Sequence, residues 1–386
     1  MAIRISDTLR FTRVKIHNWM NFRDAEVHLL SRAFFVGPNA AGKSNFLDVF
    51  RFLADITRPA GGGLQAAISS RRGMTGVRSL HGRRPSDVEI EVDIGSDNDP
   101  SAWRYCLAFN RRGPRNLPTV AREEIWRHGA CIEKRAIKED VEAMSQTLLE
   151  QTAANQQFRA LAEFLRTCRY LHVVPQIVRD RRRALERGDD PYGGDLLRRM
   201  KDMPKKRRDP RLRRVAEALR IAAPQFRDLK LEDDKDGVPH LWAAFSHWRG
   251  KMANQNEEAF SDGTLRLIGL LWSIGEGGGP LLLEEPELSL NDAVVGQIPP
   301  MFARMQRLSG RQVLATTHAA ALLDVNVGLK EVHLIEVDEN GSKITTIYDD
   351  PAIRSQSEHG MSISQAVLPR LRPADIESLS GMNVAA

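Results

Sequence analysis

Residues 34–45 read FFVGPNAAGKSN, an apolar strand that runs into Gly37 and then, after four residues, into Gly42, Lys43 and Ser44. This spacing is typical of a phosphate-binding loop, in which glycines let successive backbone N–H groups turn toward phosphate oxygens. Lys43 would reach the β and γ phosphates, and the hydroxyl of Ser44 would hold Mg²⁺. The alternative is a glycine-rich turn without a ligand.

A second apolar run, PLLLEEPE at 280–287, ends in adjacent carboxylates. Such a run predicts a buried parallel strand, whose carboxyl end is where ligands bind in open α/β sheets. We expect Glu284 to help hold Mg²⁺ and Glu285 to orient or deprotonate the attacking water. The alternative is a strand that ends in a solvated acidic turn at Pro286.

Two further motifs flank that run. FSDGTLR at 260–266 opens an apolar helical stretch, and QVLATTH at 312–318 is another buried strand that ends in a histidine. The order of the motifs resembles that of ABC-type ATPases. It is most similar to the clade that includes RecF, the heads of structural-maintenance-of-chromosomes (SMC) proteins, the OLD-family nucleases and many ATPases of bacterial defence systems. The resemblance covers nearly the whole chain.

The resemblance implies an α/β fold, namely an ABC-type P-loop ATPase head with a mixed β lobe, a parallel-sheet lobe and a helical basic insertion. It implies ATP and Mg²⁺ as cofactors, and a homodimer whose heads enclose two ATP molecules, possibly within a higher oligomer. We expect ATPase lobe I at 1–178, the basic insertion at 179–225, lobe II at 226–348 and a C-terminal tail at 349–386.

The family motifs also imply roles for single residues. Ser261 and Gly263 match the signature motif, which would close over the γ phosphate of the opposite protomer, and His318 matches the switch histidine that contacts the γ phosphate. Asn39 and Asn45 join the cofactor-binding residues of the phosphate loop.

Other matches are less direct. Residues 289–292 (SLND) resemble the loop by which two heads sense each other. The glutamine that senses Mg²⁺ is matched to Gln176, for which a plain surface glutamine is the alternative. Asp262 stands where transporter signatures have glycine, and Asn291 stands where many relatives have histidine. Both departures disfavour a transporter.

Composition agrees with a cytoplasmic ATPase. Hydrophobic residues make up 42% of the 386, and no apolar stretch is long enough to span a bilayer, so we expect no membrane partner. The three cysteines, Cys106, Cys131 and Cys168, are expected to be buried reduced thiols, because their spacing does not fit a metal site.

Positive charge is concentrated in parts of the chain. Lys and Arg number 56 against 50 acids, and residues 179–214 are especially rich in them, with a second basic segment at 71–84. Either segment could bind DNA or another nucleic acid through its phosphates. The alternatives are a solvated face or a docking surface for an acidic protein.

Periodicity predicts several more elements. Strands are expected at 88–94, 103–109 and 123–127, and a polar helix at 141–166. Asp236-Gly237 predicts a hairpin between two short strands, and the acids at 232–236 indicate a solvated turn more than a metal cluster.

These observations favour an ATPase that dimerises around ATP and gates nucleic-acid binding or a partner effector, in anti-phage defence or DNA repair. The chain has no long heptad region, which argues against a chromosome-tethering protein. It shows no second acidic cluster of nuclease type, so we expect any nuclease to be a separately encoded effector. The alternative function is an ATP-dependent scaffold with negligible turnover that sequesters and releases such an effector.

Overall fold

The computed structural model describes residues 8–81, 87–111, 117–136, 143–152, 155–183, 189–246, 252–372 and 376–381. The chain divides into two compact units. Unit 1 comprises Met1–Arg169, Gly278–Leu282 and Gln306–Ala386, and unit 2 comprises Tyr170–Gly277 and Leu283–Met305. The lobe and insertion boundaries expected from the sequence remain predictions.

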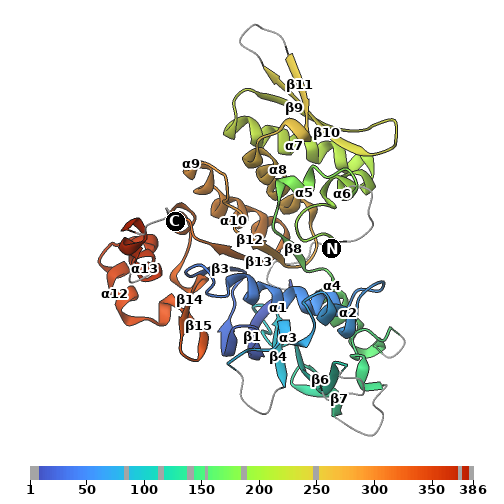
Figure 1. Ribbon diagram of the computed structural model, residues 1–386, viewed down its shortest axis with the longest axis vertical. Helices are drawn as coiled ribbons and strands as arrows, with labels where there is room; N and C mark the ends of the chain where they lie inside the picture. Colours follow the sequence, from blue (N-terminus) through green and yellow to red (C-terminus); the bar gives the residue numbers. More distant parts are fainter. Residues whose placement is uncertain are drawn as a thin grey trace. The chain divides into compact units, whose positions relative to one another are not determined.

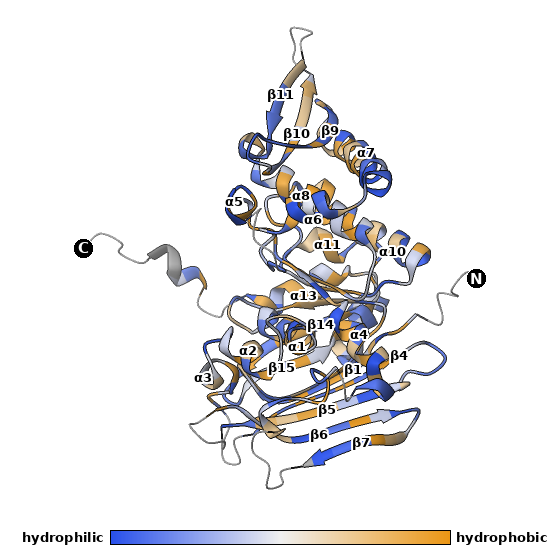
Figure 2. Cartoon of the chain, turned by 90° about the vertical axis from the view of Figure 1, so that its right-hand side faces the viewer, coloured by the Kyte–Doolittle hydropathy of each residue, from blue (hydrophilic) through white to orange (hydrophobic). Residues whose placement is uncertain are grey.

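Unit 1 contains an antiparallel sheet in the order β2-β1-β4-β5-β6-β7 (Figure 1). Its strands are β1 (Arg10–Trp19), β2 (Phe22–His28), β4 (Val88–Gly95), β5 (Trp103–Asn110), β6 (Thr119–Arg127) and β7 (Ala130–Ala136). The predicted strands at 88–94, 103–109 and 123–127 are confirmed. Buried residues alternate with more exposed ones at the start of β4, and Figure 2 shows both hydrophilic and hydrophobic residues along β5 and β6.

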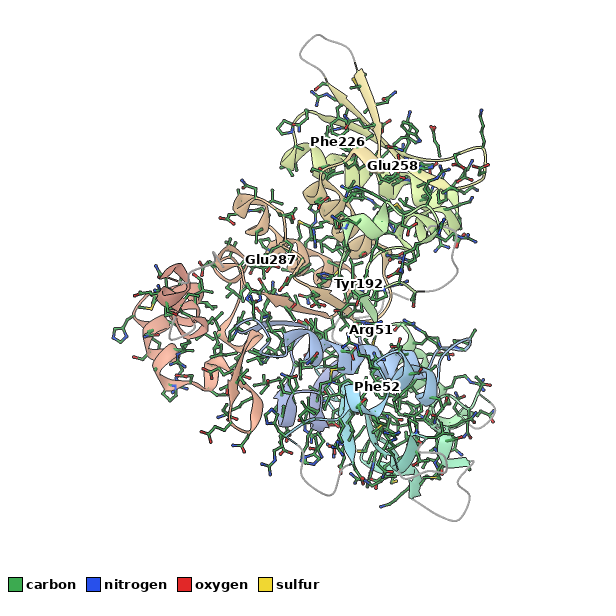
Figure 3. All side chains as sticks on the ribbon, viewed as in Figure 1. Arg51, Phe52, Tyr192, Phe226, Glu258 and Glu287 are labelled. Carbon is green, nitrogen blue, oxygen red and sulfur yellow. The ribbon has the colours of Figure 1, made fainter. Side chains whose placement is uncertain are left out.

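The apolar side of this sheet packs on α1 (Lys43–Ile56), the helix that follows the phosphate loop. Phe52 of α1, labelled in Figure 3, stacks on Phe109 of β5 at 5.4 Å and contacts Trp19 of β1 at 5.1 Å. Phe50 contacts Phe11 of β1 at 4.7 Å between ring centroids. Aromatic residues at helical spacing in α1 therefore fix the helix against the sheet.

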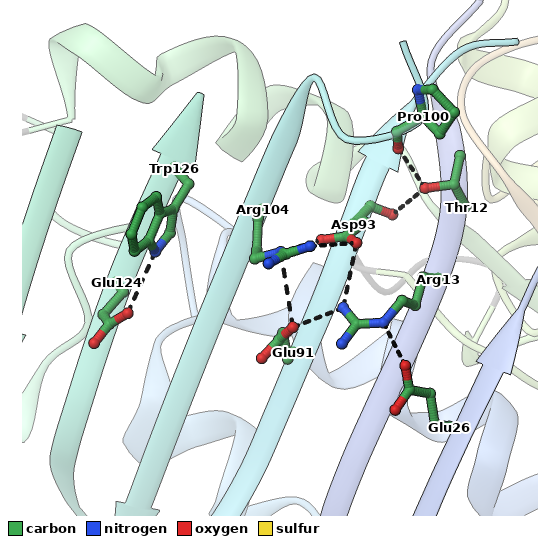
Figure 4. A network of polar contacts seen from close by, with 9 residues as sticks. All are labelled: Thr12, Arg13, Glu26, Glu91, Asp93, Pro100, Arg104, Glu124 and Trp126. Carbon is green, nitrogen blue, oxygen red and sulfur yellow. Dashed lines mark hydrogen bonds and ion pairs between the residues drawn. The ribbon is translucent and has the colours of Figure 1, made fainter. Parts of the chain in front are cut away.

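A chain of charges crosses the strands of the same sheet (Figure 4). Arg13 of β1 donates to Glu26 at 2.7 Å and to Glu91 at 2.6 Å. Arg104 of β5 donates to Asp93 at 2.6 Å, and Asp93 also accepts from Arg13 at 3.2 Å. These cross-strand pairs hold the register of the four strands β2, β1, β4 and β5.

A second six-stranded sheet, in the order β15-β14-β3-β13-β12-β8, carries the phosphate-loop strand. Its strands are β3 (Arg32–Val36), β8 (Arg169–Leu171), β12 (Leu281–Glu284), β13 (Val313–Thr317), β14 (Val332–Asp338) and β15 (Gly341–Thr346). β3 and β13 are parallel neighbours, and every residue of both is buried, as expected for the apolar run at 312–318. The chain passes between the units within β8 and within β12.

The remaining helices of unit 1 are short. They are α2 (Leu64–Ser69), α3 (Met74–Val77), α4 (Arg159–Arg166), α11 (Ala320–Leu323), α12 (Pro351–Glu358) and α13 (Ile363–Leu371), and α10 (Ile298–Ser309) passes from unit 2 into unit 1. The expectation of three buried thiols is wrong at one position, because Cys131 is exposed, whereas Cys106 and Cys168 are buried and all three are free.

The predicted polar helix at 141–166 is wrong over most of its length. Only α4 is α-helical there, after isolated 3-10 turns at Ala143–Ser145 and Gln156–Phe158, and residues 141–142 and 153–154 lie outside the described chain. Two carboxylates hold this segment through distant contacts: Glu123 accepts from the backbone N–H of Leu148 at 2.9 Å, and Glu150 accepts from that of Leu64 at 3.2 Å. Long-range contacts of this kind override helix propensity.

Unit 2 is built around the apolar helix α8 (Asp262–Glu276). Its other helices are α5 (Pro175–Val178), α6 (Leu196–Asp202), α7 (Lys205–Ala222) and α9 (Asp292–Val295), and its antiparallel sheet has the order β11-β10-β9, with β9 (Phe226–Asp233), β10 (Pro239–Ser246) and β11 (Met252–Asn256). The predicted hairpin is therefore β9–β10. Asp234 accepts the backbone N–H groups of Asp236 and Val238 in that turn. In the described part of the chain, the helices are too short or too polar to cross a membrane.

Candidate functional site

The loop between β3 and α1 has a conformation that requires glycine. Gly42 has a φ of 101°, and a Cβ built on it would lie 1.9 Å from Nδ2 of Asn21. A Cβ on Gly37 would lie 2.5 Å from the carbonyl oxygen of Ile335. Both glycines of the motif are therefore fixed by steric contacts with distant segments.

Asn21 and Ser342 support this loop from outside it. Asn21 donates to the carbonyl of Ala41 at 2.8 Å, and Ser342 donates to the same oxygen at 2.7 Å. Asn45 donates to Oδ1 of Asn21 at 2.8 Å. The phosphate-loop motif did not identify Asn21 or Ser342, because both lie in segments far from the loop in sequence.

The ammonium group of Lys43 lies inside the loop. Its Nζ donates to the carbonyls of Gly37 and Pro38, each at 3.0 Å, and the residue is only 6% exposed. Lys43 is also the first residue of α1, so the cation and the positive end of the helix dipole act at one place. Asn39 and Ser44 are exposed on the same loop. The loop therefore has the charge and the donors that a polyphosphate needs.

His318 lies next to the start of this loop. Thr317, the last residue of β13, is level with Val36, the last residue of β3, so His318 and Gly37 both follow directly after paired strand ends. His318 is half-buried. Unit 1 thus brings the predicted switch histidine beside the predicted phosphate loop.

In unit 2, Tyr170 of β8 and His172 just after it bond to the predicted acidic residue Glu284. The hydroxyl of Tyr170 donates to the Glu284 carboxylate, and Nδ1 of His172 donates to the Glu284 carbonyl at 3.2 Å. Burial lowers the pKa of the His172 imidazole, which favours its neutral form. No motif in the sequence identified Tyr170 or His172.

Glu285 has an unusual backbone conformation. Its φ is 44°, in the left-handed region that non-glycine residues seldom adopt. A cavity of about 10 Å³, room for about one water molecule, is lined by Glu284, Glu285, Arg266 and the apolar residues Leu171, Val173, Leu270, Leu283 and Pro286. Burial lowers the pKa of the Arg266 guanidinium, while the charge of Glu285 opposes that shift. A carboxylate, a cation and a water-sized space therefore meet here.

The predicted signature residues begin α8. Ser261 is the N-cap and accepts from the backbone N–H of Thr264 at 3.2 Å. A Cβ on Gly263 would lie 2.4 Å from the carbonyl oxygen of Ser289, which belongs to the predicted head-sensing loop. Ser261 is exposed, so its hydroxyl is accessible from outside the chain.

Gln176 lies on α5 and is exposed. Its Nε2 is 3.4 Å from Oδ2 of Asp262, and Arg179, the C-cap of α5, donates to Oδ1 of Asp262 at 2.8 Å. No sequence motif singled out Arg179. Unit 2 therefore brings together Gln176, Asp262 and the signature residues; their roles toward a nucleotide remain predictions.

Three other groups in unit 2 offer ligand atoms within 4.8 Å of one another: His240, Glu257 and Glu258. The two oxygens of buried Glu257 already accept from Nδ1 of His240 and the N–H of Leu241, each at 2.7 Å. These bonds explain the group as an internal contact of the fold.

Comparison with known families identifies residues 32–324 with the model described as "AAA domain, putative AbiEii toxin, Type IV TA system". This match covers more than half of the chain and contains every predicted site residue. No curated protein matches the chain.

Solved SMC head structures share the fold. An SMC head bound to the C-winged helix domain of ScpA is 14% identical, with a TM-score of 0.54, over 89% of this chain and 99% of that one. An SMC head of Pyrococcus furiosus, bound to the C-terminal domain of ScpA, is 13% identical, with a TM-score of 0.52, over 92% and 100%. One from Pyrococcus yayanosii is 11% identical, with a TM-score of 0.51, over 94% and 99%. The predicted fold, an SMC-like P-loop ATPase head, is confirmed.

Proposed function

Because the chain belongs to the AAA domain family described with the putative AbiEii toxin, we propose that it binds ATP with Mg²⁺, hydrolyses the ATP and dimerises around two ATP molecules. The observation that carries this proposal is the Lys43 ammonium, which is buried at the start of α1 and lies 3.0 Å from each of two loop carbonyls. A γ or β phosphate is a stronger acceptor than a carbonyl, so a nucleotide would draw the cation away from them.

The other predicted residues take roles that suit their chemistry. Ser44, Glu284 and Gln176 would hold Mg²⁺, whose charge would help neutralise the phosphates. Glu285 would orient the attacking water, and His318 would donate to the γ phosphate. Ser261, an exposed hydroxyl at a helix N-terminus, would contact the nucleotide of the partner protomer.

The basic insertion supports nucleic acid as a partner, because its cations fall into two sets. One set is neutralised by acids within unit 2: Arg181, Arg183, Arg198, Arg199, Lys201 and Arg208. Other cations, on α7, are exposed and have no ion-pair partner among the described residues; besides Lys205 and Arg220, they are Lys206, Arg207, Arg213 and Arg214.

The last four of these cations form one stripe, which we call the α7 stripe. Lys206 and Arg213 are seven residues apart, as are Arg207 and Arg214, and seven residues make nearly two helical turns. The buried residues of α7, among them Leu212 and Leu219, take the opposite face. A row of cations on one side of a helix matches the phosphates of a nucleic-acid backbone.

The second basic segment supports this partner less. Arg71 is bonded to Asp48 at 2.6 Å and to Asp55 at 2.9 Å, and Arg83 and Arg84 lie outside the described residues. We therefore assign the nucleic-acid contact to the α7 stripe. A cytoplasmic ATPase that gates nucleic acid, in defence or DNA repair, is the function proposed.

A separate protein effector, such as a nuclease, is the second candidate partner. It is supported by the two similar SMC heads whose structures contain a bound ScpA domain. If an effector is bound and turnover is negligible, the chain would be a scaffold. The rate of phosphate release by the purified chain decides between the enzyme and the scaffold.

The central experiment uses Glu285→Gln. With ATP and Mg²⁺, this variant should accumulate a dimer in light scattering, because binding persists while hydrolysis stops. Ser261→Arg in the same background should remain monomeric, since a large cation would block the contact with the partner's nucleotide. Steady hydrolysis by a species that scatters as a monomer would contradict the proposal.

A further inference from the structure

Arg179 fastens the segment that leads into the signature motif. Its guanidinium donates to the carbonyl of Phe260 at 2.7 Å and to the Asp262 carboxylate at 2.8 Å, and its Nε is 3.4 Å from the carbonyl of Glu257. The planar group thus spans six residues of chain, from Glu257 to Asp262. Lysine, with a point charge, cannot reproduce this set of bonds.

The two ends of this segment are anchored differently. Glu257 is buried and held by His240 and Leu241, within the β10 strand of the same unit. The side chain of Asp262 is 43% exposed, and in the described part of the chain its carboxylate accepts from Arg179 on Oδ1 and from Gln176 on Oδ2. One end is therefore buried in the fold, and the other, at the start of α8, is linked to α5 through the Asp262 side chain.

We propose that Arg179 and Asp262 form a clasp that joins α5 to the signature segment, so that Gln176, Ser261 and Gly263 shift as one piece. The proposal rests on the proposed function, in which Gln176 senses Mg²⁺ and the signature residues meet the partner's nucleotide. Mg²⁺ would bind the amide oxygen of Gln176, whose Nε2 group donates to Asp262, while Arg179 keeps α5 attached to the start of α8. The clasp thereby gives nucleotide binding in one protomer an energetic link to dimer formation.

The clasp also accounts for Asp262, which stands where transporter signatures have glycine. Glycine has no acceptor for Arg179 or Gln176, so a glycine signature could not be joined to α5 in this way. Arg179 and Asp262 are positioning residues in this account, since neither needs to touch the nucleotide.

The test is a double-mutant cycle in the Glu285→Gln chain, with Arg179→Met, Asp262→Asn and both together. Each single change should weaken ATP-dependent dimerisation about tenfold in sedimentation equilibrium, and the double variant should be no weaker than the weaker single one. ATP affinity of the monomer, from calorimetry, should change by less than about twofold. Arg181→Met, which removes an exposed ion pair with Asp234 in the same unit, is the matched control and should dimerise like its parent.

Hydrogen exchange of the ATP-free chain provides a readout that does not depend on dimers. Arg179→Met should raise amide exchange at residues 257–265, and Arg181→Met should not. Unchanged exchange at residues 257–265 would overturn the clasp. So would a double variant whose loss of dimer affinity equals the product of the losses in Arg179→Met and Asp262→Asn, because the two side chains would then act independently. A Glu285→Gln parent that never dimerises would instead refute the proposed function, and the exchange result would still decide the clasp. Arg179→Lys covers the case in which the methionine variant misfolds, and it should also raise exchange.

Discussion

The phosphate loop and the basic insertion both carry cations suited to phosphate, but their contacts reach very different distances along the chain. Lys43 bonds to carbonyls five and six residues before it. In the insertion, Arg181 bonds to Asp234, 53 residues on, and Arg199 to Glu276, 77 residues on. Whether a cation is free to bind phosphate can thus be predicted from the sequence only where its protein partners lie close by in the chain. Substitutions in both regions test this contrast.

The largest effect is expected at the phosphate loop. Lys43→Ala removes the one lysine of the phosphate-loop motif. Loss of one partner of a buried charge pair, here the ammonium that would face the ATP phosphates, costs about 2–5 kcal/mol of binding free energy. ATP affinity in calorimetry should fall by at least about thirtyfold, while the melting temperature stays near that of the parent. Wild-type affinity in this variant would show that the loop does not bind the phosphates.

Acid should weaken the sheet beneath the loop. His333 of β14 is level with Phe35 of β3 and stacks on its ring at 5.1 Å, and burial lowers the pKa of His333 to about 4. In the unfolded chain, the His333 imidazole binds a proton below about pH 6.5. In the folded chain, it binds a proton only below about pH 4. The contribution of neutral, buried His333 to the free energy of unfolding is therefore complete above about pH 6.5. It is lost as the pH falls toward 4, by up to about 3 kcal/mol.

Urea unfolding between about pH 4.5 and 7.5 measures this loss. His333→Phe should flatten the pH dependence, because the variant has no proton to exclude from the core. His359→Gln is the control, since His359 is exposed in the fold whereas His333 is buried. An unchanged slope in His333→Phe would mean that other groups carry the acid sensitivity.

The same contrast explains how much the sequence could predict. The strand before Gly37, the strand before His318 and the helix after Ser261 follow from local patterns, and the structure has them. The false helix at 141–166 failed because Glu123 and Glu150 accept from the backbone N–H groups of Leu148 and Leu64, in contacts between distant segments that no helical pattern reports. Tyr170, Arg179 and Asn21 were missed for a related reason, since each acts through a partner elsewhere in the chain.

A smaller effect is expected on the α7 stripe. Arg213→Ala with Arg214→Ala removes two exposed cations, and alanine preserves the helix. If both side chains bind phosphates, the slope of log affinity against log salt should fall by about 0.9 for each phosphate that is no longer neutralised. Anisotropy of a labelled DNA duplex, read at several salt concentrations, measures this slope. All sequences should weaken alike, because backbone contacts carry no base information.

The smallest effect is expected from cations that are already paired. Arg181→Ala with Arg198→Ala removes the same number of positive charges as the stripe variant, but it breaks bonds to Asp234 and Asp202 instead. Exposed ion pairs contribute about 0–1 kcal/mol to stability, so the fold should persist. If direct contacts govern DNA binding, the salt slope should stay within error of the parent. If only the long-range field matters, both double variants should weaken binding equally, because they change the net charge by the same amount. Equal weakening would therefore show that paired and unpaired cations of the insertion contribute alike to DNA binding. The ion pairs within unit 2 would then not decide which cations bind DNA.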